Sequence, residues 1–140
     1  TAEETIPLRW PILRAGMERE SAIFPGDDAQ TTCHFGAFEG GRLVGVVSIY
    51  PAAFPERAEL ERTWQLRGMA TAAEVRGRGF GRHLLEACEK AVRMRGGAWL
   101  WCSARTPATG FYARHGWERA GGEFEIPTAG PHFRMLRRVG

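Results

Sequence analysis

The chain is poor in cysteine and lysine and has no long apolar run. Its three cysteines, Cys33, Cys88 and Cys102, lie far apart and include no Cys-x-x-Cys pair. That spacing argues against a zinc site and against a disulfide framework, so we expect isolated buried thiols and no bound metal. No apolar segment approaches the roughly 20 residues of a membrane helix, and the chain does not start with a basic segment followed by an apolar stretch. We therefore expect a cytoplasmic protein with no membrane partner.

The composition is that of a folded globular protein. A length of 140 residues is enough for a core but short for two ordinary domains, so we expect a single domain over residues 1–140. Hydrophobic residues make up 44% of the chain and charged residues 25%, which excludes disordered and low-complexity classes.

Charge is distributed unevenly along the chain. Residues 1–62 contain six arginines and ten acidic residues, whereas residues 63–140 contain twelve arginines, one lysine and six acidic residues. The second half, at +7, should prefer an anionic ligand, and arginine forks suit phosphate oxygens. The overall charge is only +3 and there is no lysine-rich arm, so we expect no nucleic-acid partner.

Periodicity and turn residues predict an α/β fold. The expected elements are, in order, a short helix over 6–14 entered through proline, a turn at 24–28, hairpin strands over 34–38 and 43–50, an exposed loop over 51–62, a buried strand over 64–71, a helix over 82–95, a buried strand over 98–102, a short helix over 108–115, and strands over 118–126 and 132–138. The strand, helix and strand across 64–102 form a βαβ unit with parallel strands.

The segment Arg76-Gly-Arg-Gly-Phe-Gly81 leads into the amphipathic helix over 82–95. Glycines that connect a strand to a helix leave free backbone N–H groups at the positive end of the helix dipole, where anions bind. Without side chains at Gly77, Gly79 and Gly81, the backbone can approach a pyrophosphate, and the neighbouring arginines can add charge-assisted contacts. The alternative is a glycine-rich turn with solvated arginines. Triphosphate and dinucleotide loops fit poorly, because no Gly-Lys-Ser/Thr is present and the next strand ends without an acidic residue.

With these residues the sequence resembles the GCN5-related N-acetyltransferase (GNAT) superfamily. Arg76–Gly81 is similar to the family's acetyl-CoA signature, Arg/Gln-x-x-Gly-x-Gly/Ala, and Leu66–Thr71 resembles the strand that pairs with the pantetheine arm. Phe111–Trp117 is similar to the family's Phe-Tyr-x-x-x-Gly-Phe segment. The resemblance covers roughly residues 33–136 and implies a mixed, mostly antiparallel sheet that is splayed at one central parallel strand pair and flanked by helices.

The resemblance implies acetyl-CoA as cosubstrate and no metal. The residues that it assigns to cofactor binding are Met69, Ala70, Thr71, Arg76, Gly77, Arg78, Gly79, Phe80, Gly81, Arg82 and Ser103. Three positions depart from the family pattern: Thr71 replaces a usual valine, Ala73 a common proline, and Ser103 a common asparagine.

The implied reaction is the direct attack of a neutral primary amine on the thioester. Backbone N–H groups near Met69–Thr71 would stabilise the developing oxyanion, and Tyr112 matches the family's acid at the leaving thiolate, with a core tyrosine as the alternative. For the base we consider His132, whose alternative is a turn histidine, and a water chain to solvent. The other candidates have structural interpretations: His34, His83, His115, Glu59 and Glu61.

The acceptor is the least defined part of the prediction. The acidic first half favours a cationic acceptor, either a small molecule or a peptide. An acetyl-CoA-binding sensor without turnover is the alternative function, and a homodimer is left open.

Overall fold

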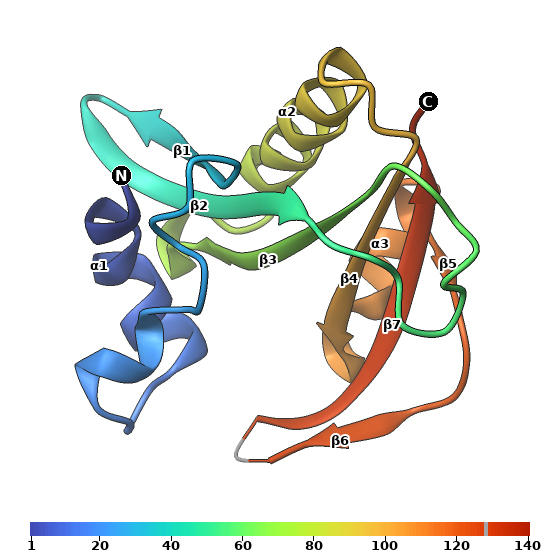
Figure 1. The fold of residues 1–140 in the computed structure, drawn as a ribbon. Coiled ribbons are helices and arrows are strands. Elements are labelled where there is room, and N and C mark those ends of the chain that lie inside the picture. The colour runs from blue at the N-terminus through green and yellow to red at the C-terminus, as the bar shows by residue number, and fades with distance from the viewer. Residues whose placement is uncertain (128) are drawn as a thin grey trace. The chain divides into compact units, whose positions relative to one another are not determined.

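The computed structural model describes residues 1–127 and 129–140; Thr128, in the predicted turn through Pro127 and Pro131, lies outside the described residues. The helices are α1 (Ala2–Leu13), α2 (Phe80–Met94) and α3 (Thr109–Arg114), with the short 3-10 helices η1 (Arg19–Ala22), η2 (Ala73–Val75) and η3 (Thr106–Ala108). The strands are β1 (Cys33–Glu39), β2 (Arg42–Pro51), β3 (Thr63–Thr71), β4 (Trp99–Arg105), β5 (Glu118–Arg119), β6 (Phe124–Ile126) and β7 (Gly130–Arg138) (Figure 1).

The strands form one mixed sheet with the hydrogen-bonded order β1-β2-β3-β4-β7-β5, and β6 also pairs with β7. The pairs of β1 with β2 and of β7 with β4, β5 and β6 are antiparallel. Strands β3 and β4 are parallel, with Thr63–Gln65 opposite Trp99–Trp101. The expected mixed sheet with one parallel pair and flanking helices is therefore confirmed.

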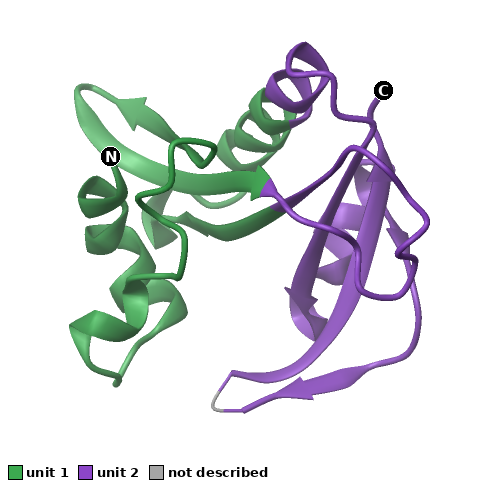
Figure 2. Ribbon diagram, viewed as in Figure 1, with its two compact units in different colours: residues 1–50, 66–88 green, residues 51–65, 89–140 purple. Residues whose placement is uncertain are grey.

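The described residues form two compact units (Figure 2). The first unit contains residues 1–50 and 66–88, and the second contains residues 51–65 and 89–140. Among the described residues, no helix is long and apolar enough to cross a membrane.

Strand β2 is the centre of the first unit. Its residues Val44–Ile49 are all buried, and such a continuous run means that both faces of the strand are covered. Ser48 accepts a hydrogen bond from Arg9 of α1. A Cβ at Gly45 would lie 2.9 Å from Leu84 of α2. Helix α1 therefore covers one face of β2 and α2 covers the other.

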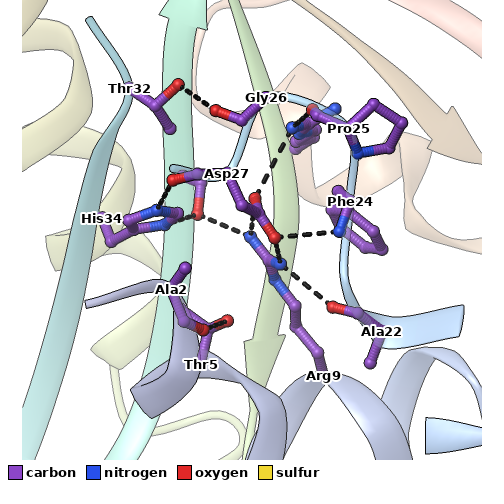
Figure 3. Close-up of polar contacts among 12 residues, drawn as sticks. Ala2, Thr5, Arg9, Ala22, Phe24, Pro25, Gly26, Asp27, Thr32 and His34 are labelled. Carbon is purple, nitrogen blue, oxygen red and sulfur yellow. Dashed lines mark hydrogen bonds and ion pairs between the residues drawn. The ribbon is translucent and has the colours of Figure 1, made fainter. Parts of the chain in front are cut away.

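Arg9 is fully buried and forms an ion pair with Asp27 (Figure 3). The guanidinium donates to both carboxylate oxygens, at 2.7 and 3.2 Å, and to the carbonyl of Ala22 at 3.1 Å. It also donates to Ser48 Oγ at 2.8 Å. These bonds connect α1 to η1, to the turn at 24–28 and to β2.

His34 completes this buried network from β1. Its Nε2 lies 2.9 Å from the carbonyl oxygen of Asp27, which can only accept, so Nε2 carries the hydrogen. In the neutral ring Nδ1 then accepts from the Ser48 hydroxyl at 2.5 Å. The structural interpretation of His34 is consistent with these contacts.

The sheet of the second unit has two different sides. Side chains alternate along a strand, so β4 directs Cys102 to one side and Trp101 to the other. Helix α3 lies on the Cys102 side, which we call the helix side (Figure 1). The loop over 52–62 covers the Trp101 side, which we call the loop side, with the Phe54 and Trp101 ring centroids 5.6 Å apart.

The structure corrects three expectations. Helix α1 begins at Ala2 instead of residue 6, because Thr1 and Glu4 form a capping box before the first proline. The loop over 51–62 is not wholly exposed, since Phe54 is fully buried. Residues 118–126 form two short strands, because the pairing with β7 shifts by two residues between Glu118 opposite Leu136 and Phe124 opposite His132.

We predict that Asp27→Asn lowers the free energy of unfolding by about 3–5 kcal/mol, because it leaves the Arg9 charge buried without its partner. Chemical denaturation monitored by circular dichroism measures this change. The matched control is Arg42→Gln, which removes an exposed ion pair with Glu74 and should cost less than about 1 kcal/mol. A loss as small as that of the control would contradict the stabilising role of the buried pair.

The same variant tests the charge state of Asp27. Burial raises its pKa, but hydrogen bonds from Arg9 and the Phe24 N–H, with the charges of Arg9 and Arg67, outweigh burial and hold the pKa below its ordinary value. The stabilisation is therefore complete above the unfolded-state pKa of about 4 and is lost as the pH falls through the lower folded-state pKa. The stability difference between wild type and Asp27→Asn should accordingly shrink below about pH 4.

Candidate active site

The glycine-rich segment forms an open loop between η2 and α2. Gly77 and Gly79 have φ angles of +80° and +88°, which glycine adopts without strain. A Cβ at either position would meet no atom within 4 Å. The space beside the backbone is therefore free for a ligand to approach.

The loop leads directly into the N-terminus of α2, a helix of 15 residues. The N–H of His83 donates to the carbonyl of Gly79 at 3.1 Å, so the N–H groups of Phe80, Gly81 and Arg82 have no acceptor within the helix. These groups lie at the positive end of the helix dipole. The loop and the helix end together fit the pyrophosphate of a nucleotide cofactor such as CoA.

The arginines of the loop are exposed and differ in their partners. Arg78 forms two contacts with Glu39, and Arg82 lies 3.6 Å from Glu86. Arg76 has no ion pair among the described residues. Exposed pairs of this kind are weak, so all three side chains can turn toward an anion.

Strand β3 contains an irregularity that the sequence interpretation missed. Gly68 has a φ of +66° in the middle of the strand. A Cβ there would lie 2.9 Å from Arg9 Nε and 3.0 Å from the Phe24 ring, so the position requires glycine. The sequence does contain a signal for this irregularity, because a lone glycine inside a strand pattern often marks a local break. It lies immediately before Met69–Thr71, the segment assigned to the pantetheine arm and the oxyanion.

Tyr112 lies on the helix side of the second unit's sheet. It is buried, with its ring centroid 5.2 Å from those of Phe111 and Trp117. Burial raises the pKa of the Cys102 thiol, and a hydrogen bond from the Tyr112 hydroxyl only partly opposes that rise. The thiol therefore stays protonated at neutral pH, and Cys102 is a poor nucleophile.

His132 and Ser103 lie on the loop side. In the β4–β7 register His132 is opposite Arg105 and Ser103 is opposite Arg134, and period-two alternation puts all four side chains on one side. His132 is a buried strand residue rather than a turn residue. Its Nδ1 lies 2.8 Å from the carbonyl of Gly130 and must donate, so Nε2 holds the lone pair of the neutral ring.

The structure thus brings together only part of the predicted site within each unit. The first unit holds Met69–Thr71 and the loop Arg76–Arg82. The second unit holds Ser103 and His132 on the loop side and Tyr112 on the helix side. His83 is exposed on α2, and His115 follows α3 with its ring 4.9 Å from Phe111.

Comparison with known proteins gives one consistent family. Residues 3–117 match the Acetyltransferase (GNAT) family. The chain is 33% identical over 139 residues to the uncharacterized N-acetyltransferase YitI of Bacillus subtilis (strain 168). The aligned region covers 99% of this chain and 93% of that protein. The chain therefore belongs to the GNAT family of acetyltransferases.

Solved structures of low sequence identity share the fold. An aminoglycoside 6′-N-acetyltransferase complexed with coenzyme A has a TM-score of 0.77 at 15% identity, covering 99% of this chain and 90% of that one. The ribosomal-protein-S18-alanine N-acetyltransferase of Escherichia coli has a TM-score of 0.76 at 16% identity, covering 99% and 87%. At these identities the likeness concerns the fold alone.

We predict that Gly79→Val lowers the affinity for acetyl-CoA at least about tenfold, because the new side chain fills the space beside the free N–H groups at the start of α2. Titration calorimetry measures the affinity, and circular dichroism checks the fold. The matched control is Gly121→Val, since Gly121 has the same φ of +88° and an equally open Cβ position outside the glycine loop. Unchanged affinity in a folded Gly79→Val protein would refute the cofactor assignment.

Proposed function

We propose that this chain is an N-acetyltransferase that transfers an acetyl group from acetyl-CoA to a primary amine. The observation that carries the proposal is the open glycine loop at the N-terminus of α2, in a chain of the GNAT family. The coenzyme A bound to the structural neighbour described above supports the same cofactor here.

Three groups of residues would hold the cosubstrate. The N–H groups of Phe80–Arg82 would bind the pyrophosphate, and Arg76, Arg78 and Arg82 would add charge. The end of β3, Met69–Thr71, would pair with the pantetheine arm, and Ser103 is a further candidate contact. Acetyl-CoA supplies the acetyl group already activated as a thioester.

Two proton transfers remain for the protein. Tyr112 would donate its hydroxyl proton to the leaving sulfur, for which its O–H must turn away from Cys102. His132 Nε2 would accept the proton of the amine or orient the acceptor. Because Cys102 stays protonated, direct attack of the amine is favoured over an acyl-cysteine route.

The rival function is a sensor that binds acetyl-CoA without turnover. A sensor needs the glycine loop but neither proton-transfer group. Thiol release from acetyl-CoA with a panel of primary amines separates the two functions. An enzyme releases CoA in proportion to acetylated amine, whereas a sensor binds acetyl-CoA and releases none.

We predict that Tyr112→Phe lowers kcat in this assay by about two to four orders of magnitude, because it removes a positioned acid. Binding of acetyl-CoA should stay near that of wild type. The hydroxyl has a buried partner in Cys102, so a stability loss of about 0.5–1.5 kcal/mol is also expected.

Cys102→Ala is the matched control for Tyr112→Phe. It removes the same hydrogen bond but keeps the hydroxyl, so it should lose stability while keeping most of the turnover. Equal losses of turnover in both variants would mean that the hydrogen bond, and not the acid, matters. Wild-type turnover in Tyr112→Phe would mean that another group or solvent protonates the thiolate.

We predict that His132→Ala removes the acidic limb of the profile of kcat/KM against pH while acetyl-CoA affinity is unchanged. If His132 only orients the acceptor, the limb persists and the KM of the amine rises. The matched control is His83→Ala, which removes an exposed histidine from α2. A profile, rate and KM like those of wild type would reject both roles of His132.

A further inference from the structure

Two arginines of the first unit share one carboxylate. Arg9 Nη1 lies 2.7 Å from Asp27 Oδ2, and Arg67 Nη2 lies 3.5 Å from Asp27 Oδ1. Among residues 1–127 and 129–140, Asp27 is the only carboxylate within ion-pair distance of either guanidinium. The group therefore carries one uncompensated positive charge.

This excess charge is poorly solvated. The Arg9 side chain is fully buried and that of Arg67 is only 16% exposed. The Nε atoms of both arginines are buried without a hydrogen-bond partner. A buried charge without a counter-ion is strongly unfavourable, so the arrangement favours a bound anion.

Aromatic rings offset only part of this cost. Both guanidiniums lie over the Phe24 ring, at 4.1 Å for Arg9 and 5.2 Å for Arg67, as does that of Arg14 at 5.0 Å. Arg67 is also 4.3 Å from the Tyr50 ring. Cation–π contacts are weaker than a paired carboxylate at such a site. Arg67 Nη1 reaches the Tyr50 hydroxyl only at 3.4 Å, a long hydrogen bond. Arg67 Nη2 donates to the carbonyl of Pro25 and lies near Asp27, so the weakly held Nη1 is the end of Arg67 that can engage a ligand.

We propose that Arg67, beside Tyr50, binds the carboxylate of the amine acceptor, so that the acceptor is a short amino acid. This inference rests on the proposed function. Arg9, Arg67 and Asp27 together carry a net charge of +1, which one carboxylate would neutralise. Arg67 and Met69 stand on either side of Gly68 in β3, so a carboxylate on Arg67 would lie next to the segment proposed to hold the thioester.

Local charge here is opposite in sign to the charge of the surrounding sequence. Residues 1–62 have four more acidic residues than arginines, which by itself favours a cationic acceptor. Glu56, Glu59 and Glu61 of that segment are exposed and belong to the second unit. The buried charge beside Tyr50 decides what binds there, because exposed charges are screened by salt.

The experiment compares short α- and ω-amino acids with their carboxamides as acceptors in the thiol-release assay. Wild type should prefer the acids by at least about tenfold in kcat/KM. Arg67→Gln should raise the KM of the acids by a similar factor and leave that of the carboxamides unchanged. Arg42→Gln, which removes an exposed arginine of the same unit, should keep the preference. Equal use of acids and carboxamides by wild type would overturn the proposal.

Binding without turnover gives an independent readout. Calorimetry with butanoate and with inorganic phosphate tests the anion site directly, even if no amine is acetylated and the proposed function fails. Saturable butanoate binding that Arg67→Gln abolishes supports the site, whereas no butanoate binding, or stronger phosphate binding that Arg67→Gln also abolishes, overturns it. Should Arg67→Gln fail to fold, Arg67→Lys keeps the charge, loses the planar fork and should weaken butanoate binding.

Discussion

The buried ion pair between Arg9 and Asp27 is the interaction on which the first unit depends. Helix α1 contains two prolines and buries only Thr5, Ile6 and Arg9, and Arg9 makes its buried polar contacts. Through Arg9 the helix contacts η1, the turn at 24–28 and Ser48 of β2. Burying a charge pair costs desolvation free energy, and removing one partner destabilises the fold further. We therefore expect these elements to fold cooperatively.

The ion pair also shapes the strand that carries the proposed site. Arg9 and Phe24 occupy the space where a Cβ of residue 68 would lie, so β3 must have glycine there and adopts a positive φ at that position. The residues on either side of this break are Arg67 and Met69. The packing of α1 is thus coupled, through Arg9 and Phe24, to the backbone that we propose for acceptor and cosubstrate binding.

Features encoded by neighbouring residues could be predicted from the sequence, and features made by distant residues could not. The glycine loop before α2 and the hairpin through Gly40-Gly41 are local patterns, and both were found where the sequence indicated. Arg9 and Asp27 are 18 residues apart, and Arg67 is 40 residues from Asp27, so no local pattern connects them. A count of charges along the chain also gives equal weight to exposed glutamates and buried arginines, so it does not show where an uncompensated charge lies.

The two sides of the second unit's sheet separate the two proton transfers of the proposed reaction. Tyr112 lies on the helix side with Cys102, and His132 lies on the loop side, opposite Arg105 in the β4–β7 register. In direct attack the amine nitrogen and the leaving sulfur are bonded to the same carbon, so a reaction centre beside Tyr112 can pass a proton to His132 only through water. Each group must then regain its original protonation state through its own side of the sheet. For His132, which is buried, that return depends on water reaching Nε2, so the role of His132 as a base requires a water path on the loop side.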